Sequence, residues 1–269
     1  MAAAAAQETG EQVVSLRGKV CLVTGASSGI GAGTAILFSR LGARLALNGR
    51  NEEKLTETAL ACESSSGEKP LLVPGDLVDE AVVRRVVEET VAFYGKLDVL
   101  VNSGGILAMG TVENTKLEDF DRVMNINVRA MFYMTQLAVP HLIQTKGNVV
   151  NVSSVNGQRS FPGVLAYCVS KASVDQMTRC AALELADKQV RVNAVCPGVI
   201  ITDVHRRAGL NEEQYAQFLQ RTQHTHALGR PGTVDEVARM IAFLASDAAS
   251  FVTGVTVPVD GGRHAMCPR

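Results

Sequence analysis

Short aliphatic runs alternate with longer amphipathic segments along this chain, and no other feature of the sequence constrains the fold as strongly. Runs of this kind are typical of strands that helices cover on both faces. Right-handed crossovers between such strands predict an α/β fold, a doubly wound (Rossmann) parallel sheet of about seven strands with helices on both faces. The predicted strands are residues 19–24, 44–47, 71–73, 99–102, 148–152, 191–195 and 255–259, and helical patterns lie near 30–41, 51–64, 79–94, 116–143, 163–186 and 233–245.

One domain accounts for nearly all of the 269 residues, because no repeat, linker or charge block divides the chain. We expect a disordered N-terminal tail over 1–15 and a single Rossmann-type domain over 16–265. The polar segment near 202–227 interrupts the alternation, and we interpret it as a helical flap over a substrate site.

Composition and charge exclude several classes of protein. The net charge is −1 and no apolar run is long enough for a membrane span, so we expect neither a nucleic-acid nor a membrane partner. The six cysteines form no C-x-x-C pair, which favours a reducing, cytoplasmic location. His224 and His226 lack a third ligand at metal-site spacing, so we expect no metal.

A glycine-rich turn follows the first predicted strand and opens the first predicted helix. Its sequence is Thr-Gly-Ala-Ser-Ser-Gly-Ile-Gly over residues 24–31. Gly25 permits the tight turn, Gly29 lets the backbone approach a pyrophosphate, and Gly31 lets the helix pack close to the sheet. The unpaired amides and the positive end of the helix dipole then favour a dinucleotide, although a plain glycine-rich turn remains an alternative at this point.

The second predicted strand ends at Asn48-Gly49-Arg50-Asn51. An NAD site places Asp or Glu here to bind the ribose hydroxyls, whereas the Arg50 guanidinium suits the 2′-phosphate of NADP(H). Asn48 and Asn51 add neutral donors. We therefore favour NADP(H), with a solvated residue at a helix start as the alternative for Arg50.

Tyr167 and Lys171 lie one turn apart on the same face of a predicted helix, and Ser154 precedes Tyr167 by thirteen positions. A tyrosine has an ordinary pKa of about 10, so it needs stabilisation of its anion to act as an acid or base near neutral pH. A lysine ammonium one turn away supplies this stabilisation, and Ser154 can hydrogen-bond a substrate oxygen. A surface Tyr–Lys pair is the alternative for these residues taken alone.

The chain resembles the short-chain dehydrogenase/reductase family from near Arg17 to near Gly262. The similar pieces come in the family's order. They are the turn over 24–31, Asp76-Leu77, Asn102 to Gly105, Asn125 to Val128, Ser154 with Tyr167 and Lys171, Asn193 with Pro197-Gly198 and Thr202, Gly229 to Gly232 with Glu236, residues 243–247, Thr253-Gly254, and Asp260 to Gly262. One departure is visible: the family's usual N-N-A-G reads Asn-Ser-Gly-Gly here, which adds flexibility beside the cofactor.

The resemblance implies a catalytic tetrad of Asn127, Ser154, Tyr167 and Lys171. Tyr167 would transfer the proton, Ser154 would hold the substrate oxygen, Lys171 would bind the nicotinamide ribose, and Asn127 would hold a water leading to solvent. The residues expected to bind the cofactor are Gly25, Ser27, Ser28, Gly29, Ile30, Arg50, Asn51, Asp76, Leu77, Asn102, Gly104, Tyr167, Lys171, Pro197, Gly198, Val199, Ile200 and Thr202. Asp76 would bind the adenine amino group, or else be a turn aspartate.

A small carbonyl or hydroxyl compound is the expected substrate, bound by Ser154, Asn156, Phe161, Val164 and Tyr167. The function indicated is an NADP(H)-dependent interconversion of a carbonyl and a secondary alcohol. The alternatives are an NAD-linked alcohol dehydrogenase, which Arg50 disfavours, and a non-catalytic dinucleotide-binding sensor or scaffold, which the complete tetrad disfavours. The family's habit and the apolar helices 116–143 and 163–186, including Met131, Phe132, Met134, Leu137 and Met177, predict a dimer or tetramer.

Overall fold

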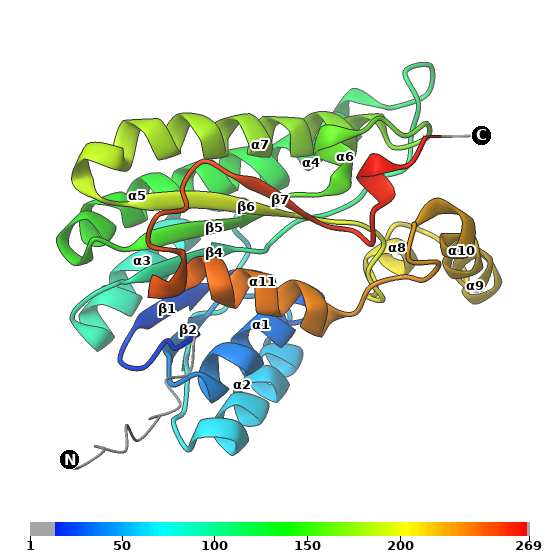
Figure 1. Cartoon of the computed structure of the whole chain (residues 1–269). Helices are drawn as coiled ribbons and strands as arrows, with labels where there is room; N and C mark the ends of the chain where they lie inside the picture. Colours follow the sequence, from blue (N-terminus) through cyan, green and yellow to red (C-terminus); the bar gives the residue numbers. More distant parts are fainter. Residues whose placement is uncertain (1–13, 268–269) are drawn as a thin grey trace, which may run out of the picture.

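A parallel sheet of seven strands organises the protein in a computed structural model, which describes residues 14–267 (Figure 1). The strand order is β3-β2-β1-β4-β5-β6-β7, and every neighbouring pair is parallel. The doubly wound fold and all seven predicted strands are therefore confirmed. The strands are β1 (Val20–Val23), β2 (Arg44–Leu47), β3 (Leu71–Leu72), β4 (Val99–Asn102), β5 (Asn148–Val152), β6 (Arg191–Pro197) and β7 (Thr256–Val259).

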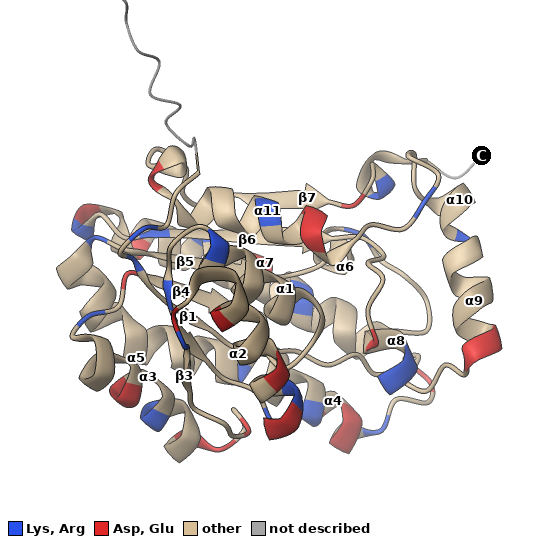
Figure 2. Ribbon diagram, turned by 90° about the horizontal axis from the view of Figure 1, so that it is seen from below, with Lys and Arg blue, Asp and Glu red and all other residues tan. Residues whose placement is uncertain are grey.

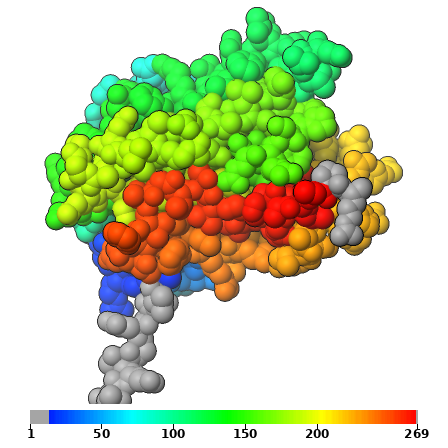
Figure 3. Space-filling view, turned by 45° about the horizontal axis from the view of Figure 1, so that its top comes forward, coloured from blue at the N-terminus to red at the C-terminus, as the bar shows by residue number. Residues whose placement is uncertain are grey.

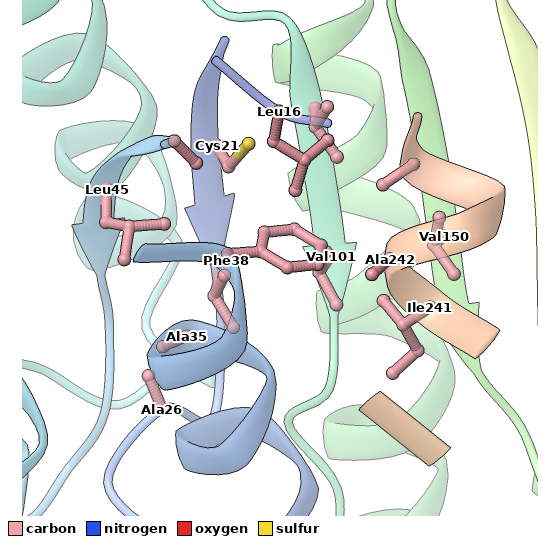
Figure 4. Packing of buried hydrophobic residues seen from close by; sticks show 14 of the residues in the cluster. Leu16, Cys21, Ala26, Ala35, Phe38, Leu45, Val101, Val150, Ile241 and Ala242 are labelled. Atoms are coloured by element: carbon pink, nitrogen blue, oxygen red, sulfur yellow. The ribbon is translucent and has the colours of Figure 1, made fainter. Parts of the chain in front are cut away.

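Helices cover both faces of this sheet. The first face carries α1 (Gly29–Arg40), α2 (Glu52–Ser66) and α11 (Val234–Ala245), and the second carries α3 (Glu80–Tyr94), α5 (Ala130–Thr145) and α7 (Leu165–Leu185). Each face has its own cluster of buried apolar side chains. In Figure 4 the ring of Phe38 extends from α1 toward Val101 of the sheet and the side chains of α11.

The helical segment predicted near 116–143 is confirmed, and a π-helical turn interrupts its α-helical pattern. It consists of α4 (Leu117–Met124), a π-helical turn (Asn125–Arg129) and α5. Such π-turns insert one extra residue and are frequent at functional sites. Here the turn contains Asn127, whose buried side chain reaches across to the backbone of Ile106.

The flap predicted near 202–227 is helical. It contains α8 (Val204–Arg207), α9 (Glu212–Gln220) and α10 (Thr222–Thr225), drawn in gold beyond the carboxyl ends of the strands in Figure 1. A short helix after β5, α6 (Val155–Gln158), lies at the same end of the molecule.

The ends of the chain extend the expected domain slightly. Residues 1–13 of the predicted tail, and residues 268–269, lie outside the described residues. Leu16 is fully buried, and Val14, which the tail was expected to include, already packs against the core of the first face. Across residues 14–267, none of the helices has both the length and the apolar character that crossing a bilayer requires.

Candidate active site

The loops after β1 and β4 leave the sheet side by side, at the point where the order of the strands reverses direction. In parallel α/β sheets this crevice is the usual place for a ligand. Gly25, with φ of +65°, lies so close to the β4 loop that a Cβ on it would stand 2.8 Å from the Cα of Gly104. Only glycine tolerates this conformation and this approach. The Thr24 hydroxyl joins the two loops by accepting the amides of Ser103 and Gly104 at 3.1 and 3.3 Å.

The amino terminus of α1 faces this crevice with its backbone donors exposed. The first four amides of a helix have no acceptor within the helix. Ser28 occupies the N-cap position, yet its side chain accepts none of these amides. The glycine turn and the start of α1 therefore fit the pyrophosphate of a dinucleotide, as the sequence predicts.

A pocket of about 460 Å³ opens beside this turn, lined by Ser27, Ser28, Arg50, Asn51, Lys54 and Arg207. Two of the three cations in it, Lys54 and Arg207, were not singled out by the sequence patterns. Arg50 has an acidic neighbour after all, because its Nη1 lies 3.4 Å from Oδ2 of Asp76. Both side chains of this pair are about half exposed, so the pairing contributes little free energy and is easily exchanged for a phosphate.

Some polar side chains near the crevice serve the fold. Asn48 is buried, and its amide donates to the carbonyls of Val73 and Gly75 at 3.0 and 3.3 Å, so its expected role as a donor to phosphate is wrong. Asn51 caps α2 by accepting the amide of Lys54. Asp76 accepts the amide of Val78, which makes it a turn aspartate as well as a partner of Arg50.

Asn102 is likewise directed into the protein. Its amide donates to Thr135 Oγ1 at 3.1 Å and to Asn151 Oδ1 at 3.0 Å, and Asn151 in turn donates to Thr178. The side chain of Asn102 thus ties β4 to β5 and α5, so its amide is not free for the cofactor contact expected of this residue.

Ser154, Tyr167 and Lys171 come together at the carboxyl end of β5. Ser154 follows β5 and caps α6 by accepting the amide of Asn156 at 3.1 Å, and its hydroxyl lies near that of Tyr167. Lys171, one turn along α7, is 4 % exposed, and its Nζ donates to the carbonyl of Val152 at 2.8 Å. The same ammonium lies 5.6 Å from the centre of the Tyr167 ring.

Burial governs the ionisation of this cluster. It raises the pKa of Tyr167 to about 12, and the nearby hydroxyl of Ser154 opposes the shift. It also lowers the pKa of Lys171 to about 8, against the attraction of the buried carboxyl of Asp175. Lys171 is not among the causes of the Tyr167 shift, so the lowering expected from it is not seen, and Tyr167 is protonated at neutral pH.

Asn127 lies at the same centre. A Cβ on Gly105 would stand 3.3 Å from Asn127 Oδ1 and 3.7 Å from Lys171 Nζ. The side chains of Asn127 and Lys171 therefore both lie against Gly105. Oδ1 of Asn127 accepts the amide of Ile106, and its Nδ2 donates to the Ile106 carbonyl and to Ser170. Its contacts hold the β4 loop in place, and the water relay through it stays a prediction.

The expected substrate residues surround the Ser154–Tyr167 pair. Asn156 Oδ1 accepts from the Ser154 hydroxyl at 3.3 Å, and its Nδ2 lies 3.4 Å from the sulfur of Cys168. Phe161 has one face of its ring covered by the guanidinium of Arg263 at 4.4 Å. Val164 is half-buried and immediately precedes α7.

The segment 197–202 continues from β6 along the crevice toward α1, since the methyl of Thr202 would lie 3.3 Å from a Cβ on Gly29. The sequence patterns did not single out His226, the residue that supports this segment. The amide of Val199 donates to Nε2 of the buried His226 at 3.1 Å. Nε2 must therefore be unprotonated. Nδ1 carries the ring proton and donates it to Thr225 Oγ1 at 3.2 Å. Nothing in the local sequence distinguishes His226 from the exposed His224.

Comparison with known proteins agrees with this geometry. The family model described as enoyl-(acyl carrier protein) reductase matches residues 25–264. A crystal structure of a short-chain dehydrogenase/reductase of unknown function from Caenorhabditis elegans superposes with a TM-score of 0.88 at 32% identity, over 94% of this chain and 97% of that one. The chain belongs to the short-chain dehydrogenase/reductase family.

Relatives within this family carry different names. The 3-oxoacyl-[acyl-carrier-protein] reductase FabG of Thermotoga maritima is 42% identical over 92% of this chain and 98% of its own length. The meso-2,3-butanediol dehydrogenase of Serratia marcescens is 35% identical over 92% of this chain and 95% of its own. This short-chain dehydrogenase/reductase is therefore an oxidoreductase, and its relatives are named for several different carbonyl and alcohol compounds.

The departure from the family's N-N-A-G sequence has a simple steric reading. A Cβ on Gly104 would meet no atom closer than 3.7 Å, and the backbone of Gly104 is not left-handed. The alanine that the family usually carries would fit here. Gly104 thus makes the loop locally less rigid, and the close approach of Gly25 does not require a glycine at this position.

The hydrogen bond from Val199 makes stability depend on pH through His226. Burial and the nearby Arg263 lower the pKa of His226 in the folded protein, against the attraction of Asp260. The unfolded chain, with a histidine pKa of about 6.5, therefore binds the proton more readily. The contribution of His226 is complete above that pH and is lost as the pH falls below it.

We predict that the free energy of unfolding falls by about 1 kcal/mol more in the wild type than in His226→Gln between pH 7.5 and 5.5, since glutamine keeps an acceptor but does not titrate. Chemical denaturation at the two pH values measures this difference. The neighbouring, exposed His224→Gln is the control and should keep the wild-type pH dependence. Identical pH slopes for wild type and His226→Gln would show that the Val199 contact is not sensitive to protonation.

Proposed function

We propose that this protein is an NADP(H)-dependent oxidoreductase that interconverts a carbonyl and a secondary alcohol, with Tyr167 as general acid and base. The observation that carries the proposal is the cluster of Ser154, Tyr167 and Lys171, in which the Ser154 hydroxyl lies near that of Tyr167 and the Lys171 ammonium lies 5.6 Å from the centre of the Tyr167 ring. This cluster lies on the same crevice as an uncapped helix terminus and a cationic pocket. These parts together fit a nicotinamide dinucleotide with phosphate on its adenosine ribose.

The bound dinucleotide would supply or accept the hydride. During reduction of a carbonyl, the oxygen gains negative charge as the hydride reaches the carbon. Ser154 holds that oxygen with its hydroxyl, and Tyr167, protonated at neutral pH, gives its proton to it. The positive charge of Lys171 then stabilises the tyrosinate that remains until a proton returns. Oxidation of the alcohol follows the same steps in reverse.

Two other functions receive less support. A non-catalytic sensor would have no need of the Ser154–Tyr167–Lys171 arrangement at the end of the crevice. An NAD-linked enzyme would place an acid at the end of β2, where this chain has Gly49 and Arg50. The expected substrate residues Asn156, Phe161 and Val164 combine apolar surface with one amide, which suits a moderately apolar carbonyl compound.

Removal of the Tyr167 hydroxyl tests the mechanism. Tyr167→Phe keeps the ring in place, and we expect kcat for NADPH-dependent carbonyl reduction to fall by at least ~10²-fold while the Kd for NADPH changes little. A carbonyl panel followed by NADPH oxidation, with fluorescence titration of the cofactor, measures both. Tyr133→Phe, which removes a hydroxyl that accepts from Arg84 at the surface, is the control. Near-normal turnover by Tyr167→Phe would rule out this mechanism.

Arg50 tests the choice of cofactor. A charge-assisted contact to phosphate is worth ~1.5–3 kcal/mol, and the low end of that range applies to an exposed side chain that must leave Asp76. We expect wild type to bind NADPH roughly 10- to 150-fold more tightly than NADH, and Arg50→Ala to lose about 10-fold of that preference. Lys69→Ala, an exposed charge on the loop between α2 and β3, serves as the control.

Equal or tighter binding of NADH by the wild type would contradict the NADP(H) assignment. An aspartate at position 49, the acceptor of an NAD site, is a poor complementary variant. Its Cβ would lie 2.9 Å from both the Cβ and the hydroxyl of Ser27, so the glycine turn would have to move.

We also propose that the protein is a homo-oligomer, a dimer or a tetramer. Two residues that favoured this from the sequence, Met131 and Met134, are buried within the chain and give no support. Leu117, Phe132 and Leu183 do, because more than half of each side chain is exposed. In Figure 3 the residues of α7, in yellow-green, lie on the molecular surface between green segments and the orange-red C-terminal part.

The free thiols of all six cysteines favour the expected cytoplasmic location.

Light scattering at micromolar concentration tests the assembly. We expect a mass of two or four chains, and Leu183→Glu, which places a charge on the exposed face of α7, should shift that mass toward one chain. Glu184→Ala on the adjacent exposed position is the control. A wild-type mass of a single chain would overturn the proposal.

A further inference from the structure

The flap makes a direct polar contact with the cofactor turn. Nη2 of Arg207, the last residue of α8, donates to the Ser28 hydroxyl at 2.8 Å, although the two residues are 179 positions apart in the sequence. In Figure 2, α8 carries basic residues, in blue, at the end of the molecule where the flap lies. The contact joins the segment over the substrate site to the loop that begins α1.

This contact occupies the side chain that would ordinarily cap α1. An N-cap serine usually accepts an amide from the first turn of its helix. The Ser28 hydroxyl accepts from Arg207 instead and caps no amide. The free amides of α1 and the Arg207 guanidinium therefore face the same space, and both favour an anion there.

Three cations from three different elements line that space. Arg50 comes from the end of β2, Lys54 from the first turn of α2, and Arg207 from the flap. Over residues 14–267, no carboxylate lies within ion-pair distance of Lys54 or Arg207, whereas Arg50 has only the long contact to Asp76. A pocket that gathers three positive charges with a single, half-exposed counter-charge suits a dianionic phosphate.

The two arginines of α8 have different partners. Arg206 forms ion pairs with Asp203 at 3.1 Å and with Glu212 of α9 at 2.7 Å, and it stacks on the ring of Tyr215 at 4.0 Å. The hydroxyl of Tyr215 donates to the carbonyl of Thr202 at 3.0 Å. Arg206 thus joins α8 to α9, so whatever holds Arg207 also restrains the larger part of the flap.

We propose that Arg207 is a specificity-determining residue that binds the 2′-phosphate of the cofactor together with Arg50 and Lys54, and that NADP(H), unlike NAD(H), thereby fastens the flap over the substrate site. The inference rests on the proposed function, because it requires a dinucleotide in the crevice. On binding, the Arg207 guanidinium exchanges the Ser28 hydroxyl for phosphate oxygens, which are stronger acceptors. The Ser28 hydroxyl is then released to cap α1.

Two fragments separate the 2′-phosphate from the remainder of the adenosine moiety. Adenosine 2′,5′-bisphosphate carries it, and AMP lacks it. We expect Arg207→Met to weaken binding of the bisphosphate by about 10-fold in calorimetric titration, and to leave the affinity for AMP unchanged. Arg207→Lys, which keeps the charge but not the planar fork, should lose less. Arg221→Met removes an equally exposed flap arginine away from this pocket and should bind both fragments like the wild type.

Hydrogen exchange of the flap amides tests the coupling. Saturating NADP⁺ should slow exchange over residues 204–220 of the wild type, whereas saturating NAD⁺ should slow it much less. In Arg207→Met the two cofactors should have equal effects, and circular dichroism with the AMP titration verifies that this variant is folded.

The outcomes distinguish the inference from the function on which it rests. A wild type that binds NADPH no better than NADH overturns the proposed function. A wild type that prefers NADPH, with Arg207→Met keeping the same preference and the same flap protection, overturns only the role of Arg207. Equal losses for the bisphosphate and for AMP would assign Arg207 to the 5′-phosphate, and would also overturn the proposal.

Discussion

Burial of both faces of the parallel sheet is the constraint on which the rest of this structure depends. Every residue of β1, β4 and β5 is buried, so these strands carry apolar side chains on both sides or polar ones that pair inside the protein. The chain Asn102–Asn151–Thr178 is the interior example, with each amide satisfied by the next oxygen. Chemistry that needs solvent and ligands is thereby restricted to the carboxyl edge, where the loops leave the sheet.

The same burial sets the protonation states at that edge. Lys171 is buried and Tyr167 is half-buried between β5 and α7, and their loss of contact with water disfavours the charged form of each. Tyr167 is consequently protonated at neutral pH. Lys171 is a cation whose pKa, about 8, lies close to neutral pH. A polar partner is already in place for each of them, Ser154 for the tyrosine and the Val152 carbonyl for the lysine. This environment agrees with an acid that gives up its proton only when a developing oxyanion draws it.

The segment between β6 and α11 links the two ends of the crevice. His226 supports the turn at Val199 near the expected nicotinamide site, and Arg207 touches the turn at Ser28 near the expected phosphates. Thr202 lies against Gly29 between them. One inserted segment thus contacts both ends of the crevice, at Val199 and at Ser28.

The sequence by itself determined the class of fold, the seven strands and the positions of the glycine turn and of Ser154, Tyr167 and Lys171. These features are local: aliphatic runs, helical periodicity and short motifs state them within a few residues. The tertiary structure alone decided which polar side chains face the crevice and which are used inside, as with Asn48 and Asn102. It also decided the π-turn at Asn127, the pairing of Arg50 with Asp76, and the contacts of His226 and Arg207. Each of these depends on a partner that is distant in the sequence, and no local pattern records such a partner, because only the packing of the sheet and its loops brings the two together.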